Sequence, residues 1–139
     1  MAMTIDVERL GGTPPVSVVA LAGELDASNY EQVIDVVENA YADGSRGLVL
    51  DLEQLTFMAS SGLFALHSAV RIMRGESPPD PEEGWSALHQ MAQDEGQASN
   101  VRLAAAQEPI ARVLDRTGML RLFALDGTRA EAVAAIQGA

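Results

Sequence analysis

Residues 47–66 read GLVLDLEQLTFMASSGLFAL, and this stretch decides how the chain folds. Its beginning, residues 47–52, is a nearly continuous apolar run bounded by turn residues, which is typical of a strand buried on both faces. From Ser60 to about Arg74 the apolar residues recur at helical spacing instead. The stretch therefore predicts a buried strand followed by a helix, with two serines and a glycine where the helix starts.

The chain before this stretch predicts a hairpin and a helix. Residues 3–10 and 16–26 have the composition of strands, and the GGTPP sequence between them contains two prolines, which cannot continue a central strand. Ser28 and Glu31 have the spacing of a capping box, so we expect a helix to start there and to end near Asp43 and Gly44.

The chain after residue 100 predicts a strand, a helix, a short strand and a terminal helix. VRLAAA at 101–106 and LRLFAL at 120–125 are the strands, and Pro109 and Gly118 bracket the helix between them. Thr128 and Glu131 repeat the capping-box spacing before the last helix. Strands and helices thus alternate along the chain, which predicts an α/β sandwich with a mixed sheet.

The charge of the chain argues against nucleic acid as a partner. Its 139 residues include 20 Asp and Glu against 9 basic residues, all arginine, for a formal net charge of −11. Binding a polyanion requires a concentrated basic surface. The acidity is most simply a source of solubility.

Metal sites and membrane segments are not expected. The chain has no cysteine, and its two histidines, His67 and His89, are far apart in the sequence. The longest apolar run, residues 16–22, is far shorter than the roughly 20 residues that a membrane span needs, and no signal peptide is recognisable. We therefore expect a cytoplasmic protein with no metal, no cofactor and no membrane contact.

Residues 75–100 form an acidic insertion. The sequence GESPPDPEEG breaks the helical periodicity, and the acidic residues of the insertion are not interspersed with Lys or Arg. Residues 85–93 could form two or three turns of helix. We hypothesise that residues 75–95 partly mask the helix that precedes them, by attraction to Arg71 and Arg74.

The two serines at the helix start admit three interpretations. Either serine can be a simple helix cap, or Ser60 can be a phosphorylation site, because a phosphate there would meet the positive end of the helix dipole. A nucleophilic Ser60 would need a base in hydrogen-bond reach, and His67 lies about 10 Å further along the helix. ASSGL also lacks the flanking glycine of a nucleophile elbow, so we expect no catalytic residue and no enzyme activity.

One strip of the same helix is expected to face away from the core. Phe64 is an apolar residue among the polar residues of this strip. It is either exposed without a functional reason, as is common, or the centre of a docking site. The strip consists of Ser60, Phe64, His67, Ser68, Arg71 and Arg74.

Three segments together resemble the STAS domain, the fold of bacterial anti-sigma-factor antagonists and of the cytoplasmic tails of sulfate transporters. They are ALAGELDASN at 20–29, GLVLDLEQLTFMASSGLFAL at 47–66 and RVLDRTGMLRLF at 112–123. The resemblance implies one domain over residues 1–139, with a mixed sheet of four to five strands, about four flanking helices and no enzymatic activity.

The resemblance also implies a site. In the antagonist branch, the first serine of an Asp-Ser-Ser-Gly segment is phosphorylated by an ATP-binding, histidine-kinase-like anti-sigma factor, and Ser60 matches that serine in position. Ser61 and Gly62 complete the motif, and Asp26 matches the family's loop aspartate. Together with the helix strip, this predicts the partner-binding residues Asp26, Asn29, Ser60, Ser61, Gly62, Phe64, His67 and Arg71. This chain departs from the pattern at Ala59, where the family has Asp.

Two functions follow from the resemblance. The chain is expected to be an anti-sigma-factor antagonist that binds a kinase-like anti-sigma factor and releases it when Ser60 is phosphorylated. The alternative is a scaffold or ligand-binding STAS domain that holds an anion or a nucleotide at Ser60–Gly62 without phosphorylation. Ala59 favours the alternative, and the sequence leaves the oligomeric state open.

Overall fold

A computed structural model of the 139-residue chain describes residues 3–77 and 100–138. The hairpin predicted at the N-terminus is confirmed, and the helix and the strand that follow it lead into the helix that starts at the two serines. These elements are β1 (Met3–Leu10), β2 (Val16–Leu25), α1 (Tyr30–Ala42), β3 (Gly47–Met58) and α2 (Ser60–Met73).

The described chain resumes with a second group of elements. They are β4 (Val101–Ala104), α4 (Glu108–Arg116), the 3-10 turn η2 (Met119–Arg121), β5 (Ala124–Asp126) and α5 (Arg129–Ile136). Pro109 lies in the first turn of α4, and Gly118 follows the helix with φ 77°, as the sequence predicted. Thr128 caps α5 by accepting a hydrogen bond from the Glu131 amide, which confirms the predicted cap.

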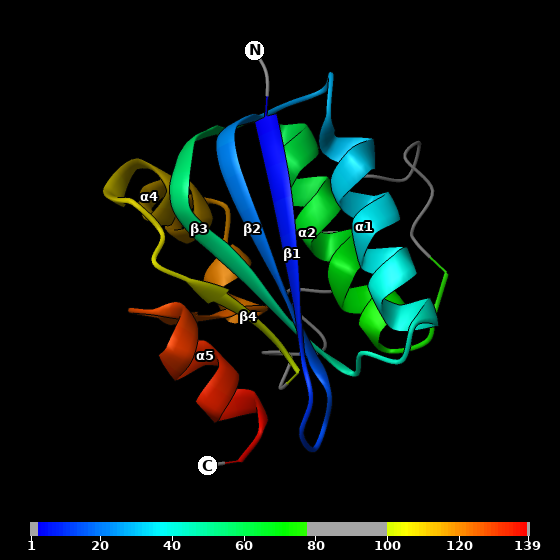
Figure 1. The fold of residues 1–139 in the computed structure, drawn as a ribbon. Helices are drawn as coiled ribbons and strands as arrows, with labels where there is room; N and C mark the ends of the chain where they lie inside the picture. The colour runs from blue at the N-terminus through cyan, green and yellow to red at the C-terminus, as the bar shows by residue number, and fades with distance from the viewer. Residues whose placement is uncertain (1–2, 78–99, 139) are drawn as a thin grey trace.

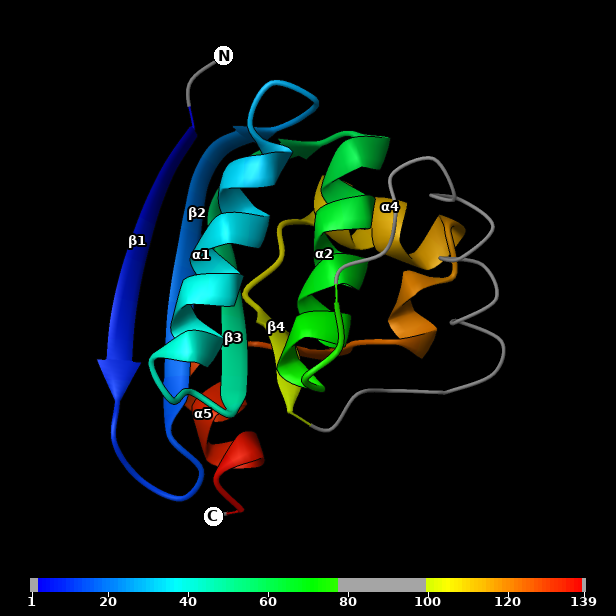
Figure 2. The ribbon, with the colours of Figure 1, turned by 90° about the vertical axis from the view of Figure 1, so that its right-hand side faces the viewer.

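The five strands form one mixed sheet in the order β1-β2-β3-β4-β5. β1 is antiparallel to β2, and the other neighbours are parallel. Successive right-handed crossovers in one direction place α1, α2 and α4 on the same face, and α5 turns back onto the other face (Figures 1 and 2). The predicted α/β architecture is confirmed.

The helices bury two apolar cores of unequal size. The larger core joins α1, α2 and α4 to one side of the sheet, and Leu50 of β3 belongs to it. The smaller core lies under α5 and includes Val49 of the same strand. Residues 47–52 are all buried, so the predicted two-sided burial of this strand is confirmed.

Two local predictions are wrong. Ser28 does not cap α1, because its amide and its hydroxyl both donate to the Asp26 carboxylate, and Asn29 stands at the cap position without a side-chain cap bond. Residues 120–125 are not one strand, since η2 occupies the first part. Leu122 and Phe123 are almost fully buried there, so they fill the core from a turn and not from a ladder.

Most of the acidic insertion, including residues 85–93, lies outside the described residues. Of that segment the structure describes residues 75–77 and 100, and it pairs Glu76 with Arg71 at 3.5 Å. Among the described helices none is both long and apolar enough to cross a membrane.

Gly62 allows the start of α2 to pack closely on the ends of β2 and β3. A Cβ atom at this position would lie 2.6 Å from Met58 Cγ and 2.9 Å from Leu25 Cγ. Both neighbours are buried, at 4% and 0% exposure, so neither has room to move aside. The glycine of the serine-glycine motif is thus a packing requirement of the fold.

Gly62→Ala should lower the free energy of unfolding. Overpacking of a filled core costs about 1–3 kcal/mol, which exceeds the gain of up to about 1 kcal/mol in helix propensity. Urea unfolding measures the difference. Gly11→Ala is the matched control, because a Cβ there meets nothing within 4 Å, and it should change stability by less than about 0.5 kcal/mol. Equal effects of the two substitutions would refute the packing role.

Candidate functional site

The loop between β2 and α1 is held in shape by Asn29. The Asn29 side-chain amide donates to the Glu24 carbonyl at 2.8 Å, and its oxygen accepts from the Asp26 amide at 2.9 Å. These two bonds fix the orientation of its side chain, and the residue is only 6% exposed. Asn29, predicted to contact a partner, therefore acts as the residue that positions the loop.

Asp26 is the anion that this loop presents. Its carboxylate accepts from the Ser28 hydroxyl at 2.6 Å and from the Ser28 amide at 2.9 Å. These two bonds, with the side-chain bond first, hold the pKa of Asp26 below its usual value. Asp26 is half-buried, so a charged oxygen remains within reach of a docking molecule.

The start of α2 lies directly beside this loop. The Ala59 amide donates to the Leu25 carbonyl at 2.9 Å, which ties the residue before Ser60 to the end of β2. The register of β2 and β3 also places the start of α2 beside the loop, because Leu25 pairs with Met58 in the sheet. The ends of two parallel strands thus bring the Asp26 loop and Ser60 to one edge of the molecule.

Ser60 is exposed at the first position of α2, and neither serine caps the helix. The cap position belongs to Ala59, whose side chain cannot accept a hydrogen bond. The interpretation of Ser60 or Ser61 as a helix cap is therefore wrong. The Ser61 hydroxyl is buried and has no hydrogen-bond partner among the described residues, whereas Ser60 is an exposed residue.

Phe64 lies one turn further along α2 and contacts Tyr30, the first residue of α1. Their rings meet edge to face, with centroids 6.0 Å apart and an interplanar angle of 83°. Both residues are half-buried, so each leaves part of its ring at the surface. The predicted docking residue Phe64 is therefore one half of an aromatic pair that bridges the two helices.

Two further members of the predicted outward strip do not face solvent. His67 and Ser68 are buried, at 1% and 0% exposure, and the Ser68 hydroxyl donates to the Phe64 carbonyl at 2.8 Å. The prediction that His67 and Ser68 point away from the core is wrong. Arg71 is half-buried beside Glu76, and Arg74 is exposed.

His67 is a buried neutral group. Burial, followed by the charges of Arg71 and Arg74, lowers its pKa to about 4 from 6.5. Its Nδ1 atom has no hydrogen-bond partner within the described part of the chain. A protonated imidazole would therefore be unfavourable in the folded state.

His67 should make folding sensitive to mild acid. Its contribution to stability is complete above pH 6.5, falls as the unfolded chain takes up a proton, and is fully lost near pH 4. Between pH 7 and pH 5 this loss amounts to about 2 kcal/mol. Urea unfolding at both pH values should show a smaller loss for His67→Gln than for wild type. His89→Gln is the control, and it should lose as much unfolding free energy between pH 7 and pH 5 as wild type does. If His67→Gln also loses as much as wild type, His67 is not the group responsible.

The structure thus brings three of the predicted residues, Asp26, Ser60 and Phe64, together with two others. We call this set the Asp26–Ser60 surface, and it consists of Asp26, Ser28, Tyr30, Ser60 and Phe64. Ser28 and Tyr30 were missed as site residues. An aromatic residue at the start of the helix that follows a GELD loop was the sequence signal for Tyr30. The described residues include no group of three or more His, Asp or Glu that could hold a metal ion.

Solved structures of similar shape cover nearly the whole chain. An anti-sigma factor antagonist from Mycobacterium paratuberculosis shares 25% identity and aligns with a TM-score of 0.67, over 98% of this chain and 95% of its own. SpoIIAA in its unphosphorylated form shares 21% identity at a TM-score of 0.65, over 98% of both chains. The Bacillus SpoIIAA in its phosphorylated form shares 20% at 0.61, over 96% and 99%.

Comparisons of sequence give a narrower result. A search of curated protein sequences finds no match. The model of the STAS domain family matches residues 4–76, which run from β1 to just beyond α2 and include every residue of the Asp26–Ser60 surface. With this match over more than half of its length, and a SpoIIAA-like fold over nearly all of it, the chain belongs to the STAS domain family.

Proposed function

We propose that this protein is an anti-sigma-factor antagonist that works by switching partners. Its partner would be an ATP-binding, histidine-kinase-like anti-sigma factor in the cytoplasm, and the protein itself would have no enzymatic activity. The observation that carries the proposal is the exposed Ser60 at the start of α2, tied to the ionised Asp26 loop by the Ala59–Leu25 bond.

The Asp26–Ser60 surface has the features of a docking site. Tyr30 and Phe64 supply apolar area that is already ordered by their mutual contact, so binding loses little side-chain entropy there. Asp26 supplies a fixed negative charge at the rim, which favours a partner with a basic group opposite it. The surface therefore combines an aromatic anchor with a polar rim.

A phosphate on Ser60 would change this surface without opposing the fold. The first turn of α2 contains no acidic residue, so the positive end of the helix dipole is not already compensated there. The phosphate would add about −1.5 to −2 charges beside Asp26. A partner that had docked its basic group against Asp26 and its apolar group against Phe64 would then meet a bulky, hydrated dianion.

The test is a pull-down from native lysate, with bound proteins identified by mass spectrometry. Wild type and Ser60→Ala should retain an ATP-binding anti-sigma factor, and Ser60→Glu should lose at least about 90% of it, because a charge at the interface centre costs roughly 1.4 kcal/mol or more. Ser77→Glu is the matched control, since it places the same charge on an exposed serine beyond the other end of α2.

Ala59→Asp completes this design. It restores the family's carboxylate before Ser60 and, if the kinase reads that carboxylate, should increase phosphorylation of Ser60 by the captured factor. Retention of the factor by Ser60→Glu, or its loss from Ser77→Glu as well, would contradict Ser60 as the switch. Capture of no such factor by wild type would contradict the antagonist function itself.

A second function is favoured by Ala59. Since the cap position of α2 carries no carboxylate, the amides of Ser60 and Ser61 suit a bound anion, such as the phosphate of a nucleotide, whereas the Gly62 amide already donates to the Ala59 carbonyl at 2.9 Å. In that case phosphate or ATP should raise the melting temperature in a saturable way. Thermal melting of wild type and Ser60→Glu measures this, because the added carboxylate should abolish the effect. A flat response of wild type would eliminate this function.

A further inference from the structure

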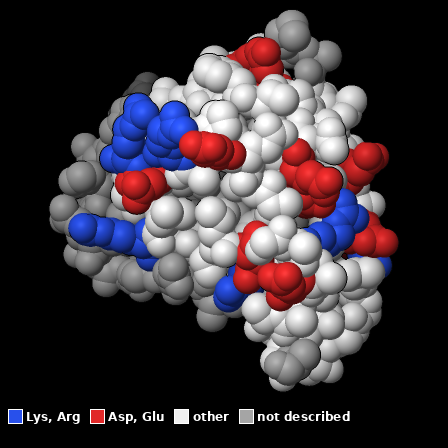
Figure 3. Space-filling model, turned by 90° about the vertical axis from the view of Figure 1, so that its left-hand side faces the viewer, with Lys and Arg blue, Asp and Glu red and all other residues white. Residues whose placement is uncertain are grey.

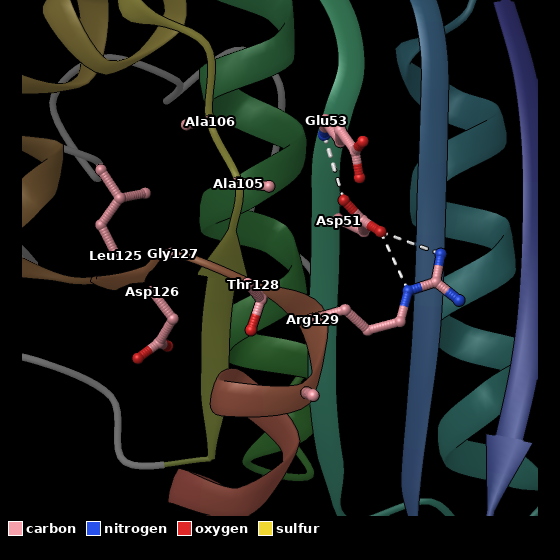
Figure 4. Close-up of a pocket in the computed structure, with 10 residues that line it drawn as sticks. Asp51, Glu53, Ala105, Ala106, Leu125, Asp126, Gly127, Thr128 and Arg129 are labelled. Carbon is pink, nitrogen blue, oxygen red and sulfur yellow. Dashed lines mark hydrogen bonds and ion pairs between the residues drawn. The ribbon is translucent and has the colours of Figure 1, made fainter.

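One half of the sheet's second face has no helix over it in the described part of the chain. α5 is eight residues long, and the core beneath it is formed by Val16, Val18, Val49, Ala104 and Ala132. Val16, Val18 and Val49 lie toward the beginnings of β2 and β3, whereas Ala104 ends β4 and Ala132 belongs to α5 itself. Figure 4 shows α5 in front of the strands only at the lower part of the view, with the upper parts of β2 and β3 uncovered on that side.

The register of the strands identifies the residues on this uncovered area. Asp6 pairs with Ala20, Ala22 with Gln54, and Glu24 with Phe57. Along each strand these residues alternate with residues of the larger core, which face α1 and α2. They therefore lie on the opposite side of the sheet. We call this area the open sheet face, and it consists of Asp6, Ala20, Ala22, Glu24, Gln54 and Phe57.

The centre of the open sheet face is apolar and shallow. Ala20 and Ala22 are half-buried alanines on the middle strand, so they form a trough between the longer side chains of β1 and β3. Phe57 is 49% exposed at the end of β3, although an aromatic ring gains strongly from burial. β2 is paired with strands on both sides, so a segment lying on this area would contact it through side chains and not through a strand ladder.

The charges around the trough are negative. Asp6 and Glu24 lie on the face itself, and Glu8 and Glu53 lie at its borders. Figure 3, whose right-hand side is the face seen in Figure 1, shows acidic side chains gathered there around few arginines. A second copy of this chain would bring the same carboxylates against these, so self-association through this face is disfavoured.

The arginines at the lower border are already paired. Arg129 donates to Asp51 at 2.9 Å and lies 3.4 Å from Glu8, as its side chain reaches across β3 to β2 (Figure 4). Arg102 donates to both oxygens of Asp126, at 2.7 and 3.1 Å. Both cations are therefore paired with other carboxylates, which leaves the charges of Asp6 and Glu24 open to a basic group of a partner.

We propose that the open sheet face docks a basic, partly apolar segment of a partner protein. Lysine or arginine side chains of the segment pair with Asp6 and Glu24, while its apolar side chains cover Ala20, Ala22 and Phe57. The face lies on the other side of the sheet from α2, so it is a surface distinct from the Asp26–Ser60 surface.

The probe is a synthetic peptide of about ten residues that alternates lysine with valine, compared with a peptide that has glutamate in place of lysine. The lysine peptide should bind, and its amide chemical-shift changes should centre on residues 20–24 and 54–57. The glutamate peptide should not bind. Asp6→Lys/Glu24→Lys should weaken binding of the lysine peptide by about tenfold, since it reverses two contacting charges.

Asp35→Lys/Glu38→Lys is the matched control, because it makes the same change of net charge on exposed residues of α1. It should change the affinity by less than about twofold. Equal weakening by both double variants, shift changes centred on α1, or binding of the glutamate peptide would overturn the proposal. Concentration-dependent shifts at residues 20–24 without peptide would overturn it too, in favour of a second copy of the chain.

Discussion

The hydrogen bond from the Ala59 amide to the Leu25 carbonyl, 2.9 Å long, is the contact on which the candidate site depends. It joins the end of β2 to the start of α2 across the sheet edge. Gly62 makes it possible, because a side chain there would collide with Leu25 and Met58. The serine-glycine motif thus has two separable roles: the glycine sets the distance between helix and sheet, and Ser60 is left exposed on top of that contact.

The electrostatics of the site follow from its hydrogen bonds. Ser28 donates twice to Asp26 and keeps it ionised, whereas α2 begins without a carboxylate at its cap or in its first turn. One anion and one uncompensated helix end therefore lie side by side. Such a surface responds to added negative charge at Ser60 mainly through what is docked on it, since the fold itself tolerates the charge.

The order of elements and the mixed sheet could be predicted from sequence, because a buried run such as residues 47–52 and a helical pattern such as that after Ser60 are strong local signals. Which faces of α2 are buried could not be predicted in this way. A projection around one axis supposes a single buried side, but α2 lies between α1 and α4 (Figure 2), so His67 and Ser68 are buried as well.

The capping box predicted at Ser28 and Glu31 was wrong for a different reason. The spacing of Ser28 and Glu31 fits a capping box, yet Asp26 competes for the same hydroxyl, and this competition depends on loop geometry that no spacing encodes. The two bonds of the Asn29 side chain, to Glu24 and Asp26, are likewise set by this loop geometry. The open sheet face is also a tertiary result, since it depends on how little of the sheet α5 covers.

The central claim is that Ser60 and the Asp26 loop form one surface. Amide chemical shifts of wild type and Ser60→Glu test it directly in the isolated protein. The account predicts changes at residues 59–64 and also at residues 26–30, with β5 and α5 unaffected. Changes confined to α2, with the Asp26 loop unmoved, would contradict it.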